Sequence, residues 1–299
     1  MPLTPSSAAG IEIWFTTDGD PSAEPLLMVM GLGTQHLGWD DDLVALFVAS
    51  GFFVIRPDNR DVGLSTKPDV GDIKALELII AALSGTPVEA PYLLSDMAAD
   101  AVAVLDHLGL GSAHVVGASM GGMIVQAMAI EHPDRVRSLT SIMSTTGDPT
   151  VGQPDAAVLP ILLGPPPTSR EEAVARGVEV ARAIGSPGLV DEDLAREKAG
   201  RAWDRCAYPQ GTGHQLLAIT ASPPRTEGLG RVTVPTLVVH GDADPLVTVS
   251  GGRATAEAVP GAELRIIAGM GHDVPRPHWA SLVDDISALA ARAGAPAAG

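Results

Sequence analysis

Short, continuous apolar runs alternate along the chain with longer helical patterns, and this alternation restricts the possible folds more than any other feature of the sequence. A strand with one buried face alternates apolar and polar residues, whereas a continuously apolar strand is buried on both faces. Strands of the second kind belong to a parallel sheet with helices on both sides. We predict strands over the following runs: Ile11–Thr17, Pro25–Met30, Phe52–Pro57, Ala113–Ala118, Val136–Met143, Pro235–His240 and Glu263–Ile267.

Helical patterns fill the intervals between these runs. The segment Ser95–Leu108 carries its apolar residues on one face and begins at Ser95, a residue type suited to an N-cap. The segment Met120–Glu131 ends before Pro133, which cannot continue a helix. We predict further helices over Leu37–Ser50, Gly251–Ala258 and His278–Ala291. The fold class is therefore α/β, with a mostly parallel central sheet flanked by helices.

The alternation stops between Thr145 and Arg231, where no strand pattern occurs. Pro, Gly and charged residues there flank helical patches, which are Arg170–Ala183, Asp191–Trp203 and His214–Ala221. We predict a core domain formed by residues 1–145 and 231–299, with a helical cap of residues 146–230 inserted into it. A smaller insert, Asp69–Pro91, contains an amphipathic stretch at Ile73–Leu83. Segments over the carboxyl ends of parallel strands are where α/β proteins bind ligands.

Composition and charge exclude several classes of partner. Hydrophobic residues make up 45% of the 299 residues, which predicts a packed core. The net charge of −17 repels nucleic-acid phosphates and anionic lipid head groups, so neither is an expected partner. No apolar run approaches the roughly 20 residues of a membrane span, and the first residues do not resemble a signal peptide. With Cys206 as its single cysteine, the chain is expected to be cytoplasmic; its sequence makes no prediction of oligomeric state.

The segment Gly117-Ala118-Ser119-Met120-Gly121 places one serine between a predicted strand and a predicted helix. It fits the pattern Gly-x-Ser-x-Gly, in which the strand turns sharply into the helix and holds the serine in a strained conformation. Side chains two positions from Ser119 would collide in such a turn, so glycine is required there. The turn brings the Ser119 hydroxyl to the rim of the sheet, at the positive end of a helix. The alternative is a glycine-rich turn with an incidental serine.

A serine hydroxyl becomes a good nucleophile only when a base removes its proton, and the base needs an acid to orient it. In this type of fold the chain order is serine, acid, histidine. Asp244 lies just beyond the strand that ends at His240, and His272 lies in a glycine-rich loop after the next strand. We predict Asp244 as the acid and His272 as the base, and we expect Asp242 to cap the turn instead. No calcium-loop pattern follows Asp242, so no metal site is predicted.

Acyl transfer also needs N–H groups directed at the developing oxyanion. The backbone N–H of Met120, directly after the serine, is one candidate, and that of Leu32, in the glycine-rich loop after an early strand, is the second. A dinucleotide-binding loop is the alternative for this segment, but His36 occupies the position of the third glycine. We also expect His36 and His214 to be candidates for the substrate pocket, the alternative for His36 being a solvated loop residue.

Nearly the whole chain, from Ile11 to Ala291, resembles the α/β-hydrolase superfamily through the serine turn, the Asp244 loop and the His272 loop, in that order. Within the superfamily it resembles actinobacterial esterases of the aclacinomycin methylesterase type, through the stretches VMGLGTQHLGW, IRPDNRDVGLST, DMAADAVAVLDHLG and VVGASMGGMI. Most superfamily members have glycine where Asp61 stands, whereas the aclacinomycin-type enzymes have aspartate.

The resemblance implies Ser119, Asp244 and His272 as a catalytic triad, with an oxyanion hole formed by Leu32 and Met120. It implies hydrolysis of a small-molecule carboxylic ester or lactone, without a cofactor, and a bracing role for Arg60–Asp61. It does not carry over the substrate, because caps vary freely and the Asp69–Pro91 insert is longer here. Two alternatives stay open on the same residues: a cofactor-free perhydrolase or haloperoxidase, and a ligand receptor that kept the hydrolase fold.

Overall fold

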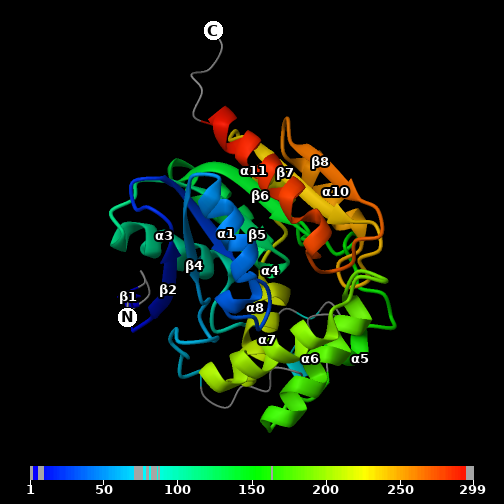
Figure 1. The fold of residues 1–299 in the computed structure, drawn as a ribbon. Coiled ribbons are helices and arrows are strands. Elements are labelled where there is room, and N and C mark those ends of the chain that lie inside the picture. Colours follow the sequence, from blue (N-terminus) through cyan, green and yellow to red (C-terminus); the bar gives the residue numbers. More distant parts are fainter. Residues whose placement is uncertain are drawn as a thin grey trace.

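The computed structural model describes residues 3–5, 10–70, 77–78, 81, 86, 88–162 and 164–293. Within these residues eight strands form one sheet in the order β1-β2-β4-β3-β5-β6-β7-β8 (Figure 1). The pairs β1–β2 and β2–β4 are antiparallel and the other pairs are parallel. The strands are β1 (Leu3–Pro5), β2 (Glu12–Asp18), β3 (Glu24–Val29), β4 (Phe52–Pro57), β5 (Ala113–Ala118), β6 (Val136–Ile142), β7 (Thr236–Gly241) and β8 (Glu263–Ile267).

Helices cover both faces of this sheet. Helices α3 and α4 pack together on one face, and α1 and α11 pack together on the other (Figure 1). The helices of the core are α1 (Asp41–Ala49), α3 (Leu94–His107), α4 (Met120–Glu131), α10 (Val249–Ala258) and α11 (Trp279–Ala293). The predicted α/β-hydrolase architecture is confirmed.

Strand β3 shows why continuous apolar runs predict this sandwich. Its residues Leu27 and Val29 join the hydrophobic cluster under α3 and α4, whereas Leu26 and Met28 join the cluster under α1 and α11. All four side chains are completely buried. A polar residue at any of these positions would place an unsatisfied group against a helix, which is why the run has no alternation.

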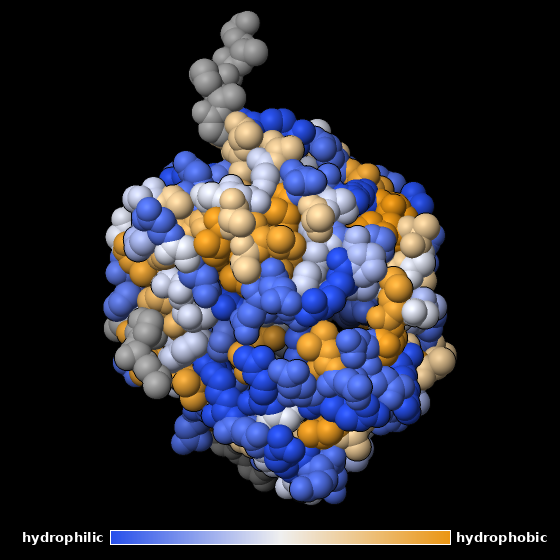
Figure 2. All heavy atoms as spheres, viewed as in Figure 1, coloured by the Kyte–Doolittle hydropathy of each residue, from blue (hydrophilic) through white to orange (hydrophobic). Residues whose placement is uncertain are grey.

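A helical insert lies between β6 and β7. Its helices are α5 (Leu159–Leu162), α6 (Arg170–Ile184), α7 (Glu192–Arg205), α8 (Gln210–Ala221) and α9 (Thr226–Leu229). Helices α6 and α7 pack against each other at one end of the core (Figure 1). Hydrophilic residues dominate the part of the surface in Figure 2 where Figure 1 places these two helices, so the insert turns a polar face to solvent.

Several helix starts differ from the predicted ones, for example α8 at Gln210 and α10 at Val249, and two of them have a visible physical reason. Helix α3 begins at Leu94, and the side chain of Asp96 accepts the N–H of Leu93 at 2.7 Å, so Ser95 lies inside the first turn and is not the N-cap. Helix α1 begins at Asp41 because the Asp40 side chain caps it, and the predicted start at Leu37 falls in a separate 3-10 turn. An N-cap depends on backbone geometry that apolar periodicity does not specify.

One strand is not predicted from the sequence, and one predicted segment lies mostly outside the described residues. Strand β1 is only three residues long and carries no periodic pattern, so the sequence does not predict it. Most of the amphipathic stretch Ile73–Leu83 lies outside the described residues. In the part of the chain that the structure describes, no helix is both long enough and apolar enough to span a bilayer.

Candidate active site

Ser119 lies in the turn that joins β5 to α4. Its backbone angles are φ 56° and ψ −122°, in a region that residues with a side chain rarely adopt. Its N–H donates to the carbonyl of Ile142 on the neighbouring strand β6, at 2.9 Å. The turn thus holds the serine at the carboxyl end of the sheet and at the N-terminus of α4.

The glycines around Ser119 are required by close backbone contacts. A Cβ atom on Gly117 would overlap the carbonyl oxygen of Gly121, and one on Gly121 would overlap the carbonyl oxygen of Val29. Gly31 approaches from the loop after β3, and a Cβ there would lie 3.1 Å from the Cβ of Ser119. The steric reason predicted for the Gly-x-Ser-x-Gly pattern is therefore confirmed.

Three side chains from the ends of β5, β7 and β8 form one hydrogen-bonded chain. The Oδ2 atom of Asp244 lies 2.7 Å from Nδ1 of His272, and Nε2 of His272 lies 2.9 Å from Oγ of Ser119. Ser119 remains partly exposed. The fold brings together the three residues that the sequence places far apart, in the orientation that a proton transfer from serine to histidine requires.

Asp244 is held as a carboxylate. Burial raises the pKa of Asp244, but hydrogen bonds from His240, His272 and the Val247 backbone, together with the charge of His272, lower it to about 2. Its Oδ1 atom accepts the N–H groups of Leu246 and Val247, both at 2.9 Å. An ionised Asp244 accepts a hydrogen bond from the Nδ1–H of His272, which leaves Nε2 unprotonated and able to accept the hydroxyl proton of Ser119.

The sequence predicts that Asp242 caps the turn in which it lies, but its side chain bonds instead to the loop after β8. Its Oδ1 accepts the N–H of Gly269 at 2.7 Å, which fastens the loop that carries His272. Among the described residues no group of three or more His, Cys, Asp and Glu side chains is arranged to hold a metal ion.

The loop after β3 supplies the second side of the site. Leu32 follows Gly31, which packs on Ser119, and Met120 begins α4 directly after Ser119. The next N–H, that of Gly33, donates to Oε1 of Gln215 at 2.8 Å, and Nε2 of Gln215 donates to the carbonyl of Arg60 at 2.7 Å.

Gln215 thus ties this loop to the core from helix α8 of the insert, and it is completely buried. Sequence reasoning missed Gln215, since a glutamine in a helical patch carries no signal. In this helical segment the sequence singles out only the neighbouring residue, His214, as a candidate for the pocket.

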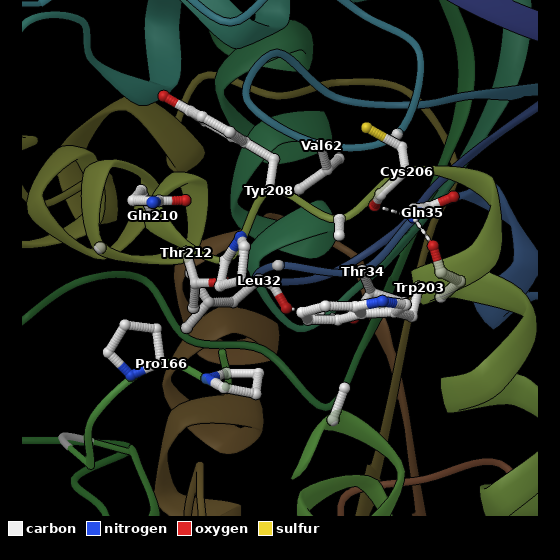
Figure 3. A pocket seen from close by; sticks show the side chains of 18 of the residues that line it. Leu32, Thr34, Gln35, Val62, Pro166, Trp203, Cys206, Tyr208, Gln210 and Thr212 are labelled. Carbon is white, nitrogen blue, oxygen red and sulfur yellow. Dashed lines mark hydrogen bonds between the residues drawn. The ribbon is translucent and has the colours of Figure 1, made fainter. Parts of the chain in front are cut away.

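A cavity of about 1120 Å³ lies between the insert and the core. Figure 3 shows Leu32 and Thr34 of the core facing Pro166, Trp203 and Tyr208 of the insert across it. The cavity reaches the site at Leu32; Ser119, Asp244 and His272 are not among its lining residues. Because Gly31 packs on Ser119, the inner end of the cavity is one residue away from the serine.

Of the two histidines predicted as candidates for the substrate pocket, only His214 lines the cavity. His214 lines the cavity, with its Nδ1 atom 3.3 Å from Oδ2 of the completely buried Asp61. His36 does not line the cavity and is not solvated: it is 7% exposed, and its ring Nδ1 lies 3.0 Å from Oδ1 of Asp58. Both expectations for His36 are therefore wrong, because its ring turns toward Trp14 and Asp58, beneath the loop.

The Arg60–Asp61 segment braces the loop after β4. Arg60 forms two hydrogen bonds with the carboxylate of Asp100 on α3, at 2.7 and 2.8 Å. Asp61, with φ 70°, accepts the Tyr92 hydroxyl at 2.5 Å. Burial and the neighbouring charge of Asp61 raise the pKa of Tyr92 well above its usual range, so Tyr92 stays a donor.

Comparison with known proteins agrees with this geometry. Residues 24–275 match the model of a family described as the alpha/beta hydrolase fold. The chain is 32% identical to rhodomycin D methylesterase DnrP of Streptomyces peucetius, over 92% of this chain and 93% of that protein. It is 26% identical to 3-oxoadipate enol-lactonase 2 of Acinetobacter baylyi, over 87% of this chain and 86% of that protein.

Among solved structures, esterase RhEst1 from Rhodococcus sp. ECU1013 superposes with a TM-score of 0.75 at 19% sequence identity, over 98% of this chain and 99% of that one. At that identity the likeness concerns the fold alone. The family match, by contrast, spans most of the chain, and the serine turn, the Asp244 loop and the His272 loop meet where the fold requires. The chain therefore belongs to the alpha/beta hydrolase fold family.

Proposed function

We propose that this protein is a serine carboxylic-ester hydrolase in which Ser119, His272 and Asp244 act as a catalytic triad. The observation that carries the proposal is the unbroken chain of hydrogen bonds from Asp244 through His272 to Oγ of Ser119, at 2.7 and 2.9 Å. Ester hydrolysis is also the activity named for the methylesterase relative.

The mechanism follows from these positions. His272 accepts the hydroxyl proton of Ser119 at Nε2 while Oγ attacks the ester carbonyl, and Asp244 stabilises the imidazolium that forms. The N–H groups of Leu32 and Met120 donate to the oxyanion. His272 then gives the proton to the leaving alkoxide, and water repeats the sequence on the acyl-enzyme to release the acid. Nucleophile, base and donors all come from the chain, so the proposed reaction uses no cofactor.

The substrate is proposed to be a small-molecule ester with a bulky, mainly apolar acyl part. A cavity of about 1120 Å³ exceeds what a short acyl chain fills, since drug-sized ligand pockets have volumes of roughly 300–1,000 Å³. Trp203 and Tyr208 offer it aromatic surface. The Streptomyces relative is named a methylesterase, and a methyl ester whose acid part fills the cavity would fit this shape. Because Cys206 is the single cysteine, we also propose that the protein acts in the reducing cytoplasm.

Intact mass spectrometry after treatment with a fluorophosphonate tests this proposal. We expect one adduct on the wild type, none on Ser119→Ala, and one on Ser50→Ala, a control at an exposed serine on the surface of the core. Absence of an adduct on folded wild type would contradict the proposal; stoichiometric ligand binding without turnover would then favour the receptor alternative. Peroxide-dependent bromination well above ester turnover would favour the perhydrolase alternative.

A further inference from the structure

The loop that carries His272 is anchored to the core on its N-terminal side. Asp242 accepts the N–H of Gly269 at 2.7 Å, and the N–H of Ala243 donates to the carbonyl of Met270 at 3.1 Å. Both anchors follow strand β7, so they are part of the hydrolase core. They end at Met270, so they leave the backbone N–H groups of Gly271 and His272 without a partner from the segment after β7, although the His272 ring bonds to Asp244 and Ser119.

The helical insert holds the other half of the loop. The N–H of His272 donates to the carbonyl of Ile184 at 2.6 Å, and the N–H of Gly271 donates to Oγ of Ser186 at 2.9 Å. The N–H of Ser186 donates to Oδ1 of Asp273 at 3.0 Å, and its hydroxyl donates to the same oxygen. Three consecutive residues, 271 to 273, thus bond to the segment that ends α6.

The contact between the segment after α6 and the His272 loop is close and buried. Ser186 is completely buried. A Cβ atom on Gly271 would lie 2.5 Å from the carbonyl carbon of Gly185, so the two backbones approach as nearly as two glycines allow. Removing the Ser186 hydroxyl would leave the buried N–H of Gly271 without its acceptor and Oδ1 of Asp273 with one donor fewer, and an unsatisfied buried N–H is costly.

We propose, resting on the function proposed above, that Ser186 is a positioning residue for His272. Its hydroxyl accepts from the residue before the histidine and donates to the residue after it, so it fixes the imidazole over Ser119 from both sides. The insert therefore has two roles: its residues line the substrate cavity, and its Ser186 helps to position the general base His272. A displacement of about 1 Å in such a site costs on the order of 100-fold in rate.

The test compares two serines that each accept a backbone N–H across the boundary between insert and core. Ser186→Ala removes the bond to Gly271, and the control Ser222→Ala removes an equivalent bond of 2.9 Å to the N–H of Leu94 on α3. For Ser186→Ala we expect kcat on a p-nitrophenyl ester and the rate constant of fluorophosphonate labelling to fall ~10- to 100-fold, with KM within about twofold. Ser222→Ala should keep both rates within about twofold.

A conservative and a disruptive substitution of Asp273 provide a second comparison. Asp273→Asn retains an Oδ1 atom that accepts both Ser186 bonds and should keep most of the activity, whereas Asp273→Ala should behave like Ser186→Ala. Equal rates in Ser186→Ala and wild type, or an equal loss in Ser222→Ala, would overturn the proposal.

A readout independent of turnover separates this proposal from the proposed function. Amide hydrogen exchange should show faster exchange at Gly271 and His272 in Ser186→Ala, with Gly269 unchanged because Asp242 still holds it. If the wild type forms no fluorophosphonate adduct, the proposed function fails, and the exchange data alone decide whether Ser186 holds the loop. Unchanged exchange at Gly271 and His272 would refute the positioning role.

Discussion

Replacing Arg205 with methionine is expected to loosen the attachment of α7 to the core. Arg205 is the last residue of α7, and its Nη1 atom lies 2.7 Å from Oδ2 of Asp58, which is completely buried. The same nitrogen donates to Oε1 of Gln35 at 2.6 Å, and the guanidinium lies 4.3 Å from the ring centroid of Trp14. Methionine keeps apolar volume against Trp14 and removes the charge.

The expected cost follows from the contacts that remain. Removing one partner of a buried ion pair costs about 3–5 kcal/mol. Asp58 keeps the N–H of His36 and of Leu64 and the ring of His36 as partners, which favours the lower end, about 3 kcal/mol. Loss of the cation–π contact adds about 1 kcal/mol. At roughly 2–4 °C per kcal/mol, the melting temperature should fall by about 8–16 °C.

The pH dependence of the stability loss in Arg205→Met gives a more specific test of the Arg205–Asp58 ion pair. Burial raises the pKa of Asp58, but hydrogen bonds from His36 and Leu64 and the charge of Arg205 hold it below its usual value. Asp58 therefore adds stability above its unfolded pKa of about 3.9, and this stability is lost as the pH falls through the folded pKa. Without Arg205 the folded pKa of Asp58 rises, so the penalty of Arg205→Met should be full at pH 7 and shrink only as the pH falls from the folded pKa of the variant toward the lower folded pKa of the wild type.

Urea unfolding followed by circular dichroism measures both quantities. Wild type, Arg205→Met, Asp58→Asn and the double variant should show a coupling of at least about 1.5 kcal/mol at pH 7. The control is Arg201→Met on the same helix, whose ion pairs with Asp41 and Glu197 are exposed at 3.6 Å and should be worth less than about 1 kcal/mol. A penalty that does not shrink as the pH falls below about 3.9, or one that is additive with Asp58→Asn at pH 7, would refute the reasoning.

Four further predictions concern the site. Asp244→Asn should lower kcat on a p-nitrophenyl ester about 10⁴-fold with the fold intact, because the imidazole of His272 loses the partner that sets its tautomer. Since the pKa of Asp244 is about 2, its carboxylate should stay ionised at pH 4 and above, and an NMR titration of Asp244 with a midpoint above pH 4 would contradict this assignment. Gly31→Ala places a Cβ 3.1 Å from that of Ser119 and should slow fluorophosphonate labelling about 10-fold. His214→Ala should raise KM for bulky esters more than it lowers kcat; an unchanged KM would remove His214 from the substrate pocket.

The sequence predicts the sheet well because the information is local. Continuous apolar runs such as Leu26–Val29 bury both faces, and each run that is predicted as a strand becomes one, with ends that differ by a residue or two. The serine turn is equally local, since the glycines that it requires stand two positions from Ser119. Chain order then places Asp244 and His272 at the ends of the next strands.

The sequence predicts far less of what the insert does. Gln215, Ser186 and Arg205 each bond to the core over more than 80 residues of chain, and no periodicity or spacing marks such partners. His36 illustrates the same limit. A histidine beside a glycine-rich loop reads as a pocket residue, and only the position of Asp58 in space shows that its ring turns inward.

These contacts change how the insert should be regarded. Gln215 holds the loop that carries Leu32, and Ser186 holds the loop that carries His272, so one inserted segment supports both the proposed oxyanion donor Leu32 and the proposed base. Substituting the insert of a relative would therefore alter the rate of acyl transfer as well as the choice of substrate. Side chains that line the cavity and have no hydrogen bond to the core, such as that of Pro166, are free to change with the substrate. Gln215 and Ser186 are not, because their partners are backbone groups of the core that stay the same whatever ester is bound.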